Sequence, residues 1–272
     1  MSTLCALISV YQHSDPHELN QALTSLVNQT RPADSIIIVE DGPLTNALEQ
    51  VLNQHIADNP TSRRIRLATN QGLGAALRAG LQHIDTEFVA RLDTDDIAAP
   101  HRFETQLALF ETRPELDVVG SAVAEFTDQP GDSTTIRALP ETHDGIARYM
   151  KINNPINHPS VMMRVRAVKQ AGGYRDVHFM EDYDLFARML AGGSRFHNIA
   201  EALTYLRVSD AQFARRTSKG MWRSEKTMQT NLVRYGIISK PRAVANFIIR
   251  STYRLLPQQV LKKAYGILFH KK

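Results

Sequence analysis

The first third of the chain alternates short apolar runs with segments of helical periodicity. The predicted strands lie at residues 4–11, 34–42, 63–70 and 87–93. The predicted helices lie at about residues 19–27, 44–56 and 70–84. Apolar strands that alternate with helices are typical of a parallel sheet covered by helices on both faces. The predicted fold class is therefore α/β, with a mostly parallel, Rossmann-like central sheet.

The second half of the chain predicts fewer but longer elements. A strand is expected at residues 116–126, and a second strand at 160–165 leads into a short helix. Residues 180–193 predict an amphipathic helix that ends at two glycines. Its apolar face would consist of Tyr183, Phe186, Ala187 and Leu190.

Polar residues follow three of the predicted parallel strands. These strand ends are Val10-Tyr11, Glu40-Asp41 and the run from Asp93 to Asp96. In open α/β sheets, ligands bind outside the carboxyl ends of the strands. We therefore expect all three strand ends to lie at one ligand-binding edge.

The run RLDTDD places Asp93, Asp95 and Asp96 within four residues. Such carboxylates repel one another unless they cap a turn or share a cation. One interpretation is that Asp95 or Asp96 caps a helix that opens near Pro100. The other is a site for Mn²⁺ or Mg²⁺, which take oxygen ligands. The glycine and glutamate of a calcium-binding loop are missing here, and GLGAALRAG lacks the Gly-Lys-Ser/Thr ending of a phosphate loop.

Charge divides the 272 residues into an acidic body and a basic tail. Residues 211–272 hold 14 lysines and arginines and one acid, whereas residues 1–210 hold 18 bases and 27 acids. Aliphatic and basic residues alternate through the tail, which predicts a helix lying in an anionic membrane interface. The alternative is that the tail helices pack back on the body. A single cysteine, Cys5, excludes an internal disulfide and favours a cytoplasmic setting. The opening residues also lack the basic leader of a signal peptide.

Five segments together resemble the family 2 glycosyltransferases, which have the GT-A fold. They are ISVYQ, IIIVEDGP, NQGLGAAL, RLDTDDIAAPHRFETQ and MEDYDLFARML, in the order and spacing of that family. The likeness covers about residues 4–210. It implies a catalytic domain over residues 1–210, with a nucleotide-sugar half to about 120 and an acceptor half from about 121. Residues 211–272 would form a basic amphipathic helical tail.

The resemblance also assigns residues to the donor. Asp93 and Asp95 would form the Asp-x-Asp element, whose Mn²⁺ or Mg²⁺ holds the diphosphate of the nucleotide sugar, with Asp95 the direct ligand. Asp41 would accept a hydrogen bond from the uracil ring. Where the family has paired aspartates, this chain has Glu40-Asp41, a departure that leaves the first position open. The remaining nucleotide-sugar residues are Ser9, Val10, Tyr11, Glu40, Asn70, Gly72 and Thr94.

The resemblance assigns Asp182 as the general base, with Glu181 orienting or contacting the acceptor. Acidic residues in a first helical turn are also favoured by the helix dipole, by about 0.3–1 kcal/mol, so capping alone could account for both. His158, Arg215 and Arg216 are candidates for contact with the acceptor; for His158 a purely structural role is the alternative.

The expected function is the metal-dependent, inverting transfer of a hexose from a UDP-sugar, with galactose the leading choice. The acceptor would be a saccharide linked to a lipid diphosphate such as undecaprenyl diphosphate. The tail narrows the likeness to bacterial enzymes that build O-antigen and exopolysaccharide repeat units, among them β-1,3-galactosyltransferases and an amylovoran biosynthesis transferase. Such an enzyme would lie on the inner face of the cell membrane and would not bind nucleic acid. The alternatives are a nucleotidyltransferase of related fold and a non-enzymatic module that binds the membrane surface.

Overall fold

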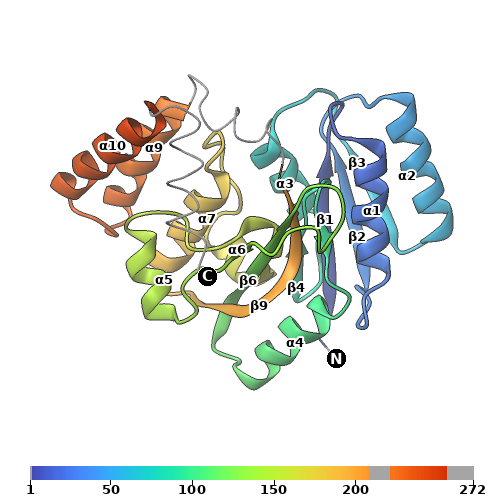
Figure 1. Ribbon diagram of the computed structural model, residues 1–272, viewed down its shortest axis with the longest axis horizontal. Helices are drawn as coiled ribbons and strands as arrows, with labels where there is room; N and C mark the ends of the chain where they lie inside the picture. Colours follow the sequence, from blue (N-terminus) through green and yellow to red (C-terminus); the bar gives the residue numbers. More distant parts are fainter. Residues whose placement is uncertain (1, 209–220, 256–272) are drawn as a thin grey trace.

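A mixed, nine-stranded sheet runs through the part of the chain that the computed structural model describes, residues 2–208 and 221–255 (Figure 1). Its order is β3-β2-β1-β4-β8-β6-β9-β5, and β7 pairs with β6. The strands are β1 (Leu4–Val10), β2 (Ser35–Glu40), β3 (Ser62–Arg66), β4 (Phe88–Arg91), β5 (Ile97–Ala98), β6 (Leu116–Phe126), β7 (Ile136–Arg137), β8 (Met162–Arg164) and β9 (Arg195–Arg207).

Helices connect these strands and cover both faces of the sheet. They are α1 (Pro16–Val27), α2 (Asn46–Asp58), α3 (Leu73–Leu81), α4 (Arg102–Thr112), α5 (His143–Met150), the 3₁₀ turn η1 (His158–Ser160), α6 (Val165–Gln170), α7 (Glu181–Ala191), α9 (Met221–Arg234) and α10 (Lys240–Leu255). Local chemistry sets several helix starts. For example, Asp15 caps α1 by accepting the backbone N–H groups of His17 and Glu18.

The parallel half of the sheet agrees with the sequence prediction. β1 lies between β2 and β4 and runs parallel to both, and β2 runs parallel to β3. The carboxyl ends of β1, β2 and β4 therefore meet at one edge, as predicted. Beyond β4, strand β8 is antiparallel to both of its neighbours, β4 and β6.

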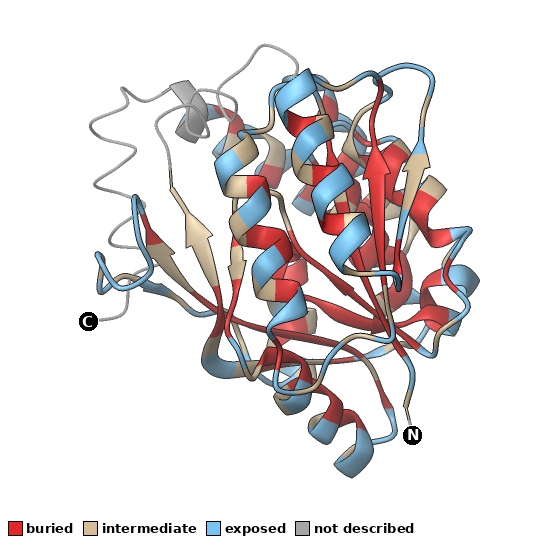
Figure 2. Cartoon of the chain, turned by 90° about the vertical axis from the view of Figure 1, so that its right-hand side faces the viewer, coloured by how far each residue is buried: buried red, intermediate tan, exposed pale blue. Residues whose placement is uncertain are grey.

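Two hydrophobic clusters pack on the two faces of this sheet. On β2, Ile36 and Ile38 belong to the cluster that α1, α2 and α4 cover, while Ile37 and Val39 belong to the cluster under α3, α6 and α7. The division follows the alternation of side chains along a strand. Figure 2 shows the buried strands behind helices whose outer faces are exposed.

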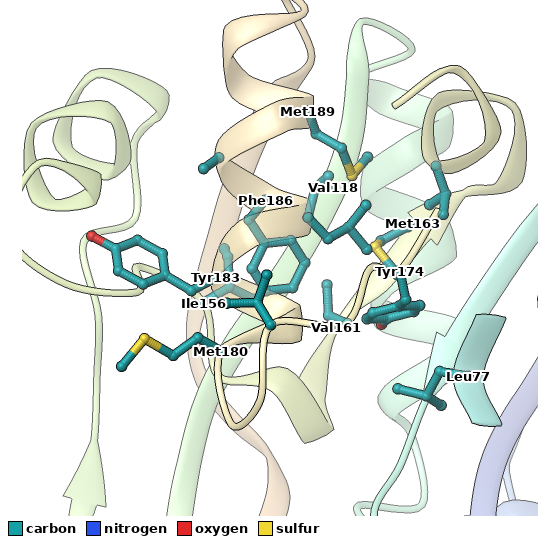
Figure 3. Packing of buried hydrophobic residues seen from close by; sticks show 14 of the residues in the cluster. Leu77, Val118, Ile156, Val161, Met163, Tyr174, Met180, Tyr183, Phe186 and Met189 are labelled. Atoms are coloured by element: carbon teal, nitrogen blue, oxygen red, sulfur yellow. The ribbon is translucent and has the colours of Figure 1, made fainter. Parts of the chain in front are cut away.

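Helix α7 is more buried than its sequence pattern predicts. The predicted face packs inward, and Figure 3 shows Phe186 and Met189 pointing toward Val118 and Met163 of the sheet, while Tyr183 points toward α5. Asp184 and Arg188 are also buried, because α9 covers the opposite side of α7. Asp184 accepts hydrogen bonds from Asn231 of α9 and from Tyr235 beyond it, each 2.8 Å long.

Part of the predicted tail therefore packs on the body. Met228 and Leu232 of α9 belong to the same cluster as α7, and α10 contacts α9 at the end of the molecule far from α1 and α2 (Figure 1). The division at residue 210 stays a prediction. Among the described residues, no helix combines the length and the apolar character needed to cross a bilayer.

Candidate active site

Asp41 fixes the loop that leads into α3. It follows β2, is 4% exposed, and accepts the backbone N–H groups of Gln71 and Gly72 at 2.7 and 2.9 Å. The Asn70 side chain donates back to the Asp41 carbonyl at 3.2 Å. Gly42 allows this close approach, because at its φ of +88° an added Cβ would lie 2.6 Å from the Asn70 nitrogen. Three predicted residues, Asp41, Asn70 and Gly72, therefore meet here.

Glu40 points to the opposite face of the sheet. Its carboxylate forms ion pairs with Arg64 and Arg66 of β3, and it is 3% exposed. Arg64 and Arg66 also pair with Glu49 of α2. Glu40 therefore holds β2, β3 and α2 together, and a contact of Glu40 with the nucleotide stays a prediction.

The end of β1 lies beside the Asp-x-Asp run. Val10 is buried, and its carbonyl accepts the Asp41 N–H at 2.8 Å. The Tyr11 N–H donates to Ser14 Oγ, which lies 3.4 Å from Thr94 Oγ1. Val10 is thus bonded directly to Asp41, and Tyr11 is linked to Thr94 through the Ser14 hydroxyl.

The carboxylates of Asp93, Asp95 and Asp96 converge, with one oxygen of each lying within 4.8 Å of the others. Asp96 is fully buried; its Oδ1 accepts the Arg207 N–H at 2.9 Å, and its Oδ2 has no hydrogen-bond partner among the described residues. Burial and the charges of Asp95 and Asp93 raise the pKa of Asp96 well above its usual range. Three converging carboxylates, one of them fully buried, fit a hard divalent cation. The helix-cap alternative is wrong, because α4 begins at Arg102 after His101 and has no side-chain cap.

Two arginines hold this run in place. Arg91, the last residue of β4, is 2% exposed, and both of its terminal nitrogens donate to the two oxygens of Asp93. Arg207, the last residue of β9, donates to the carbonyl groups of Asp95 and Thr127 at 3.1 and 3.0 Å. The run is therefore anchored from both β4 and β9.

Asp182 lies at the start of α7, and its side chain is 18% exposed. One oxygen accepts the Asn154 amide at 2.7 Å, and the other accepts the Tyr183 N–H at 2.7 Å. Burial raises the pKa of Asp182 to about 6, although the backbone bond from Tyr183 and the charge of Arg91 oppose the rise. A carboxylate with such a pKa can accept a proton near neutral pH, as a general base must.

Glu181 packs against the start of α3. It is 8% exposed, and an added Cβ at Gly74 would lie 3.2 Å from the Glu181 Cβ. Burial, followed by the charge of Asp182, raises the pKa of Glu181 to about 8. Since Gly72 opens α3 and binds Asp41, this contact joins the predicted donor residues to the predicted acceptor residues.

His158 lies between Asp182, the predicted base, and Tyr174 of the core. Its Nε2 lies 2.8 Å from the Tyr174 hydroxyl, and its Nδ1 lies 3.9 Å from an oxygen of Asp182. Burial, followed by the charge of Arg91, lowers its pKa well below the usual range, so the ring is neutral at pH 7. Arg215 and Arg216 lie outside the described residues.

Sequence reasoning missed Arg91, Asn154 and Arg207. Arg91 carries a visible signal, since a charged residue inside the apolar run FVARLD needs a partner. Asn154 and Arg207 carry no such signal, because their partners lie 28 and 112 positions away in the sequence.

Comparison with known families decides which class of enzyme this site belongs to. The model of the family "Glycosyl transferase family 2" matches residues 5–172. The chain belongs to glycosyltransferase family 2. Relatives with full-length matches agree with this assignment. An uncharacterized glycosyltransferase of Haemophilus influenzae is 36% identical, over 97% of this chain and 98% of its own length.

Two further relatives of this family 2 glycosyltransferase carry specific names. The amylovoran biosynthesis glycosyltransferase AmsE of Erwinia amylovora is 36% identical over 95% of this chain and 96% of its own. The UDP-Gal:alpha-D-GlcNAc-diphosphoundecaprenol beta-1,3-galactosyltransferase of Escherichia coli is 33% identical over 92% of this chain and 90% of its own.

Solved structures confirm the predicted GT-A fold. Residues 1–349 of S. aureus TarS, in complex with UDP-GlcNAc, match 97% of this glycosyltransferase and 80% of that chain, with a TM-score of 0.72 and 14% identity. The mannosyltransferase PcManGT of Pyrobaculum calidifontis was solved in complex with GDP-Man and Mn²⁺. It matches 98% of this chain and 76% of its own, with a TM-score of 0.66 and 14% identity.

Proposed function

We propose that this family 2 enzyme is a metal-dependent, inverting glycosyltransferase. It moves a hexose, with galactose the leading choice, from a UDP-sugar to a saccharide linked to a lipid diphosphate. The product contributes to a bacterial surface polysaccharide such as an O-antigen or an exopolysaccharide. One observation carries this proposal: Asp182, whose pKa is raised, lies in the same group of contacting residues as Asp41 and the Asp93–Asp96 run.

The acceptor half of the site supplies the base. A sugar hydroxyl is a poor nucleophile until its proton is removed during attack, and positioned general bases contribute about 10²–10⁴-fold to such steps. The Asp182 carboxylate takes that proton, while the Asn154 amide holds its orientation. Direct attack opposite the leaving group inverts the anomeric carbon, so an α-linked donor gives a β-glycoside.

The donor half of the site holds the nucleotide. Asp95 would ligate the cation directly, with Asp93 of the same element held by Arg91 and Asp96 beside them. A bound Mn²⁺ or Mg²⁺ neutralises the charge of the leaving diphosphate. Asp41 positions the 70–72 loop, whose backbone forms the wall of the predicted nucleoside pocket.

The relatives support the choice of substrates. The E. coli relative is named for UDP-galactose and for an acceptor joined to undecaprenol through a diphosphate, and the Erwinia relative is named for amylovoran biosynthesis. UDP-GlcNAc is bound by TarS and GDP-mannose with Mn²⁺ by PcManGT, two proteins of the same fold. Together these names favour a UDP-hexose donor, a divalent cation and a lipid-linked acceptor.

A membrane surface is the proposed partner of α10. This helix turns Asn246 and Ser251 inward, whereas Val244, Ile248 and Ile249 are 59%, 56% and 66% exposed. The Asn246 amide donates to the Lys151 carbonyl and to the Gln229 side chain, at 2.8 and 3.2 Å. Outward aliphatic residues with an inward polar face are the reverse of an ordinary surface helix.

Charge on α9 and α10 favours an anionic surface. The exposed charged residues on both helices are basic: Arg223, Lys226, Arg234, Lys240 and Arg242. The one acid of the described residues 221–252 is Glu225, which is fully buried and paired with Arg250 at 2.8 Å. Basic and aliphatic side chains without exposed acids suit an anionic lipid surface. We propose that the enzyme lies on the cytoplasmic face of the membrane, where a lipid-linked acceptor would be presented.

The proposal is tested with the variant Asp182→Asn and purified full-length protein. The variant should bind UDP with Mn²⁺ as the wild type does, measured by calorimetry, and should transfer galactose from UDP-galactose to a synthetic lipid-diphosphate acceptor at least about 10²-fold more slowly. Asp176→Asn changes an exposed aspartate near the same helix and should retain full activity. Wild-type transfer by Asp182→Asn would overturn the assignment of the base, and a wild type that does not bind UDP would overturn the donor assignment.

A further inference from the structure

Arg91 is a buried cation with an unusual set of neighbours. Its two terminal nitrogens grip both oxygens of Asp93 in a fork, and its Nε is buried without a hydrogen-bond partner among the described residues. Taking a guanidinium out of water costs several kcal/mol unless its partners compensate. The bonds to Asp93 offset part of this cost, and they fix the cation at the end of a strand, directly beside the carboxylate run.

The charge of the same side chain also acts on the proposed base, Asp182. The charged and titratable groups around Asp182 are Glu181 on its own helix, His158 from η1, Tyr174 beside His158, and Arg91 and Asp93 from the end of β4. Arg91 is the cation in this set, and its charge lowers the pKa of both Asp182 and Glu181 against the effect of burial. One guanidinium therefore acts on the donor side and on the acceptor side.

A second buried arginine on the sheet shows what a purely structural role looks like. Arg164 is 8% exposed and lies opposite Phe88, at the other end of β4. It pairs with Glu87, donates to the Leu116 carbonyl at 2.9 Å and stacks over the ring of Phe88 at 4.8 Å. All of these partners lie far along the strand from the Asp93–Asp96 run.

We propose that Arg91 is a positioning residue that locks the Asp93 carboxylate and presents positive charge to Asp182, which couples the donor and acceptor halves of the site. The inference rests on the proposed function. Because Arg91 donates to both Asp93 oxygens, Asp93 anchors the run, and the other two carboxylates would be left to face the donor's cation. Because its fork and its charge act on different partners, the two effects can be separated by substitution.

The experiment compares Arg91→Met, which removes the fork and the charge, with Arg91→Lys, which keeps the charge and loses the fork. UDP affinity with Mn²⁺ is measured by calorimetry, the pH profile of kcat/KM by transfer from UDP-galactose, and folding by thermal melting. Arg91→Met should weaken UDP binding about tenfold or more. It should also move the acid limb, the fall of kcat/KM at low pH, to higher pH. Arg91→Lys should also weaken UDP binding but keep the acid limb near its wild-type position. Arg164→Met should melt at a lower temperature with unchanged UDP affinity and an unchanged acid limb.

Each outcome supports or refutes the proposed role of Arg91. A folded Arg91→Met protein with wild-type UDP affinity and acid limb would overturn the proposal. If Arg91→Met does not fold, Arg91→Lys decides it: weakened UDP binding supports the fork, and wild-type UDP binding refutes it. If the wild type itself fails to bind UDP with Mn²⁺, the proposed function is wrong, whereas binding by the wild type with no effect at Arg91 refutes this inference alone.

Discussion

The pH dependence of transfer follows from the environment of Asp182. The proposed base, Asp182, acts only when it is ionised, and burial raises its pKa to about 6. With that pKa, about 91% of the enzyme carries the ionised base at pH 7 and about 9% at pH 5, so kcat/KM should fall about tenfold between these values. An aspartate with the ordinary pKa of about 3.9 would lose less than about a tenth of its activity over the same range.

Asn154→Ala tests the cause of this behaviour. The Asn154 amide donates to the Asp182 carboxylate at 2.7 Å and so favours the charged form. A hydrogen bond to a charged group contributes about 1.5–3 kcal/mol and one pKa unit corresponds to about 1.36 kcal/mol, so its removal should move the acid limb up by about one to two pH units. The limb is measured as kcat/KM between pH 4.5 and 8 with saturating Mn²⁺.

Asn153→Ala is the matched control, since the side chain of Asn153 contacts Arg250 rather than Asp182. Its acid limb should coincide with that of the wild type. A wild-type limb near pH 4, or an unchanged limb in Asn154→Ala, would refute the assignment of Asp182 as a base tuned by burial and by this amide.

Two further substitutions test the nucleotide loop and the membrane surface. Gly42→Ala places a Cβ 2.6 Å from the Asn70 nitrogen at a φ of +88°, so it should lower the free energy of unfolding by about 1–3 kcal/mol in urea titrations and weaken UDP binding. Gly131→Ala, at a φ of +97° with no atom within 4 Å, should leave UDP affinity unchanged. Ile248→Asp should reduce flotation with phosphatidylglycerol vesicles about tenfold or more and leave activity on a water-soluble acceptor unchanged. Equal flotation of Ile248→Asp and of Thr252→Asp, an exposed polar position on the same helix, would contradict the membrane assignment.

The sequence by itself determined the alternation of strands and helices at the start of the chain. It also determined which strand ends carry acidic groups. Both follow from local properties: apolar periodicity sets the elements, and parallel strands bring their carboxyl ends to one edge. The family resemblance then assigned roles to Asp93, Asp95 and Asp182 from motif positions alone, and the structure places these residues in one connected site.

Only the tertiary structure decided how the side chains are used. Glu40 and Asp41 are neighbours in sequence, yet the pleat of β2 sends one to the arginines of β3 and the other to the loop before α3. Helix α7 is buried on both sides because α9, which lies 30 or more residues later, covers its second face. The raised pKa of Asp182 likewise depends on burial, which outweighs the backbone bond from Tyr183 and the charge of Arg91. Desolvation and long-range contacts arise from packing, so no local pattern in the sequence encodes them.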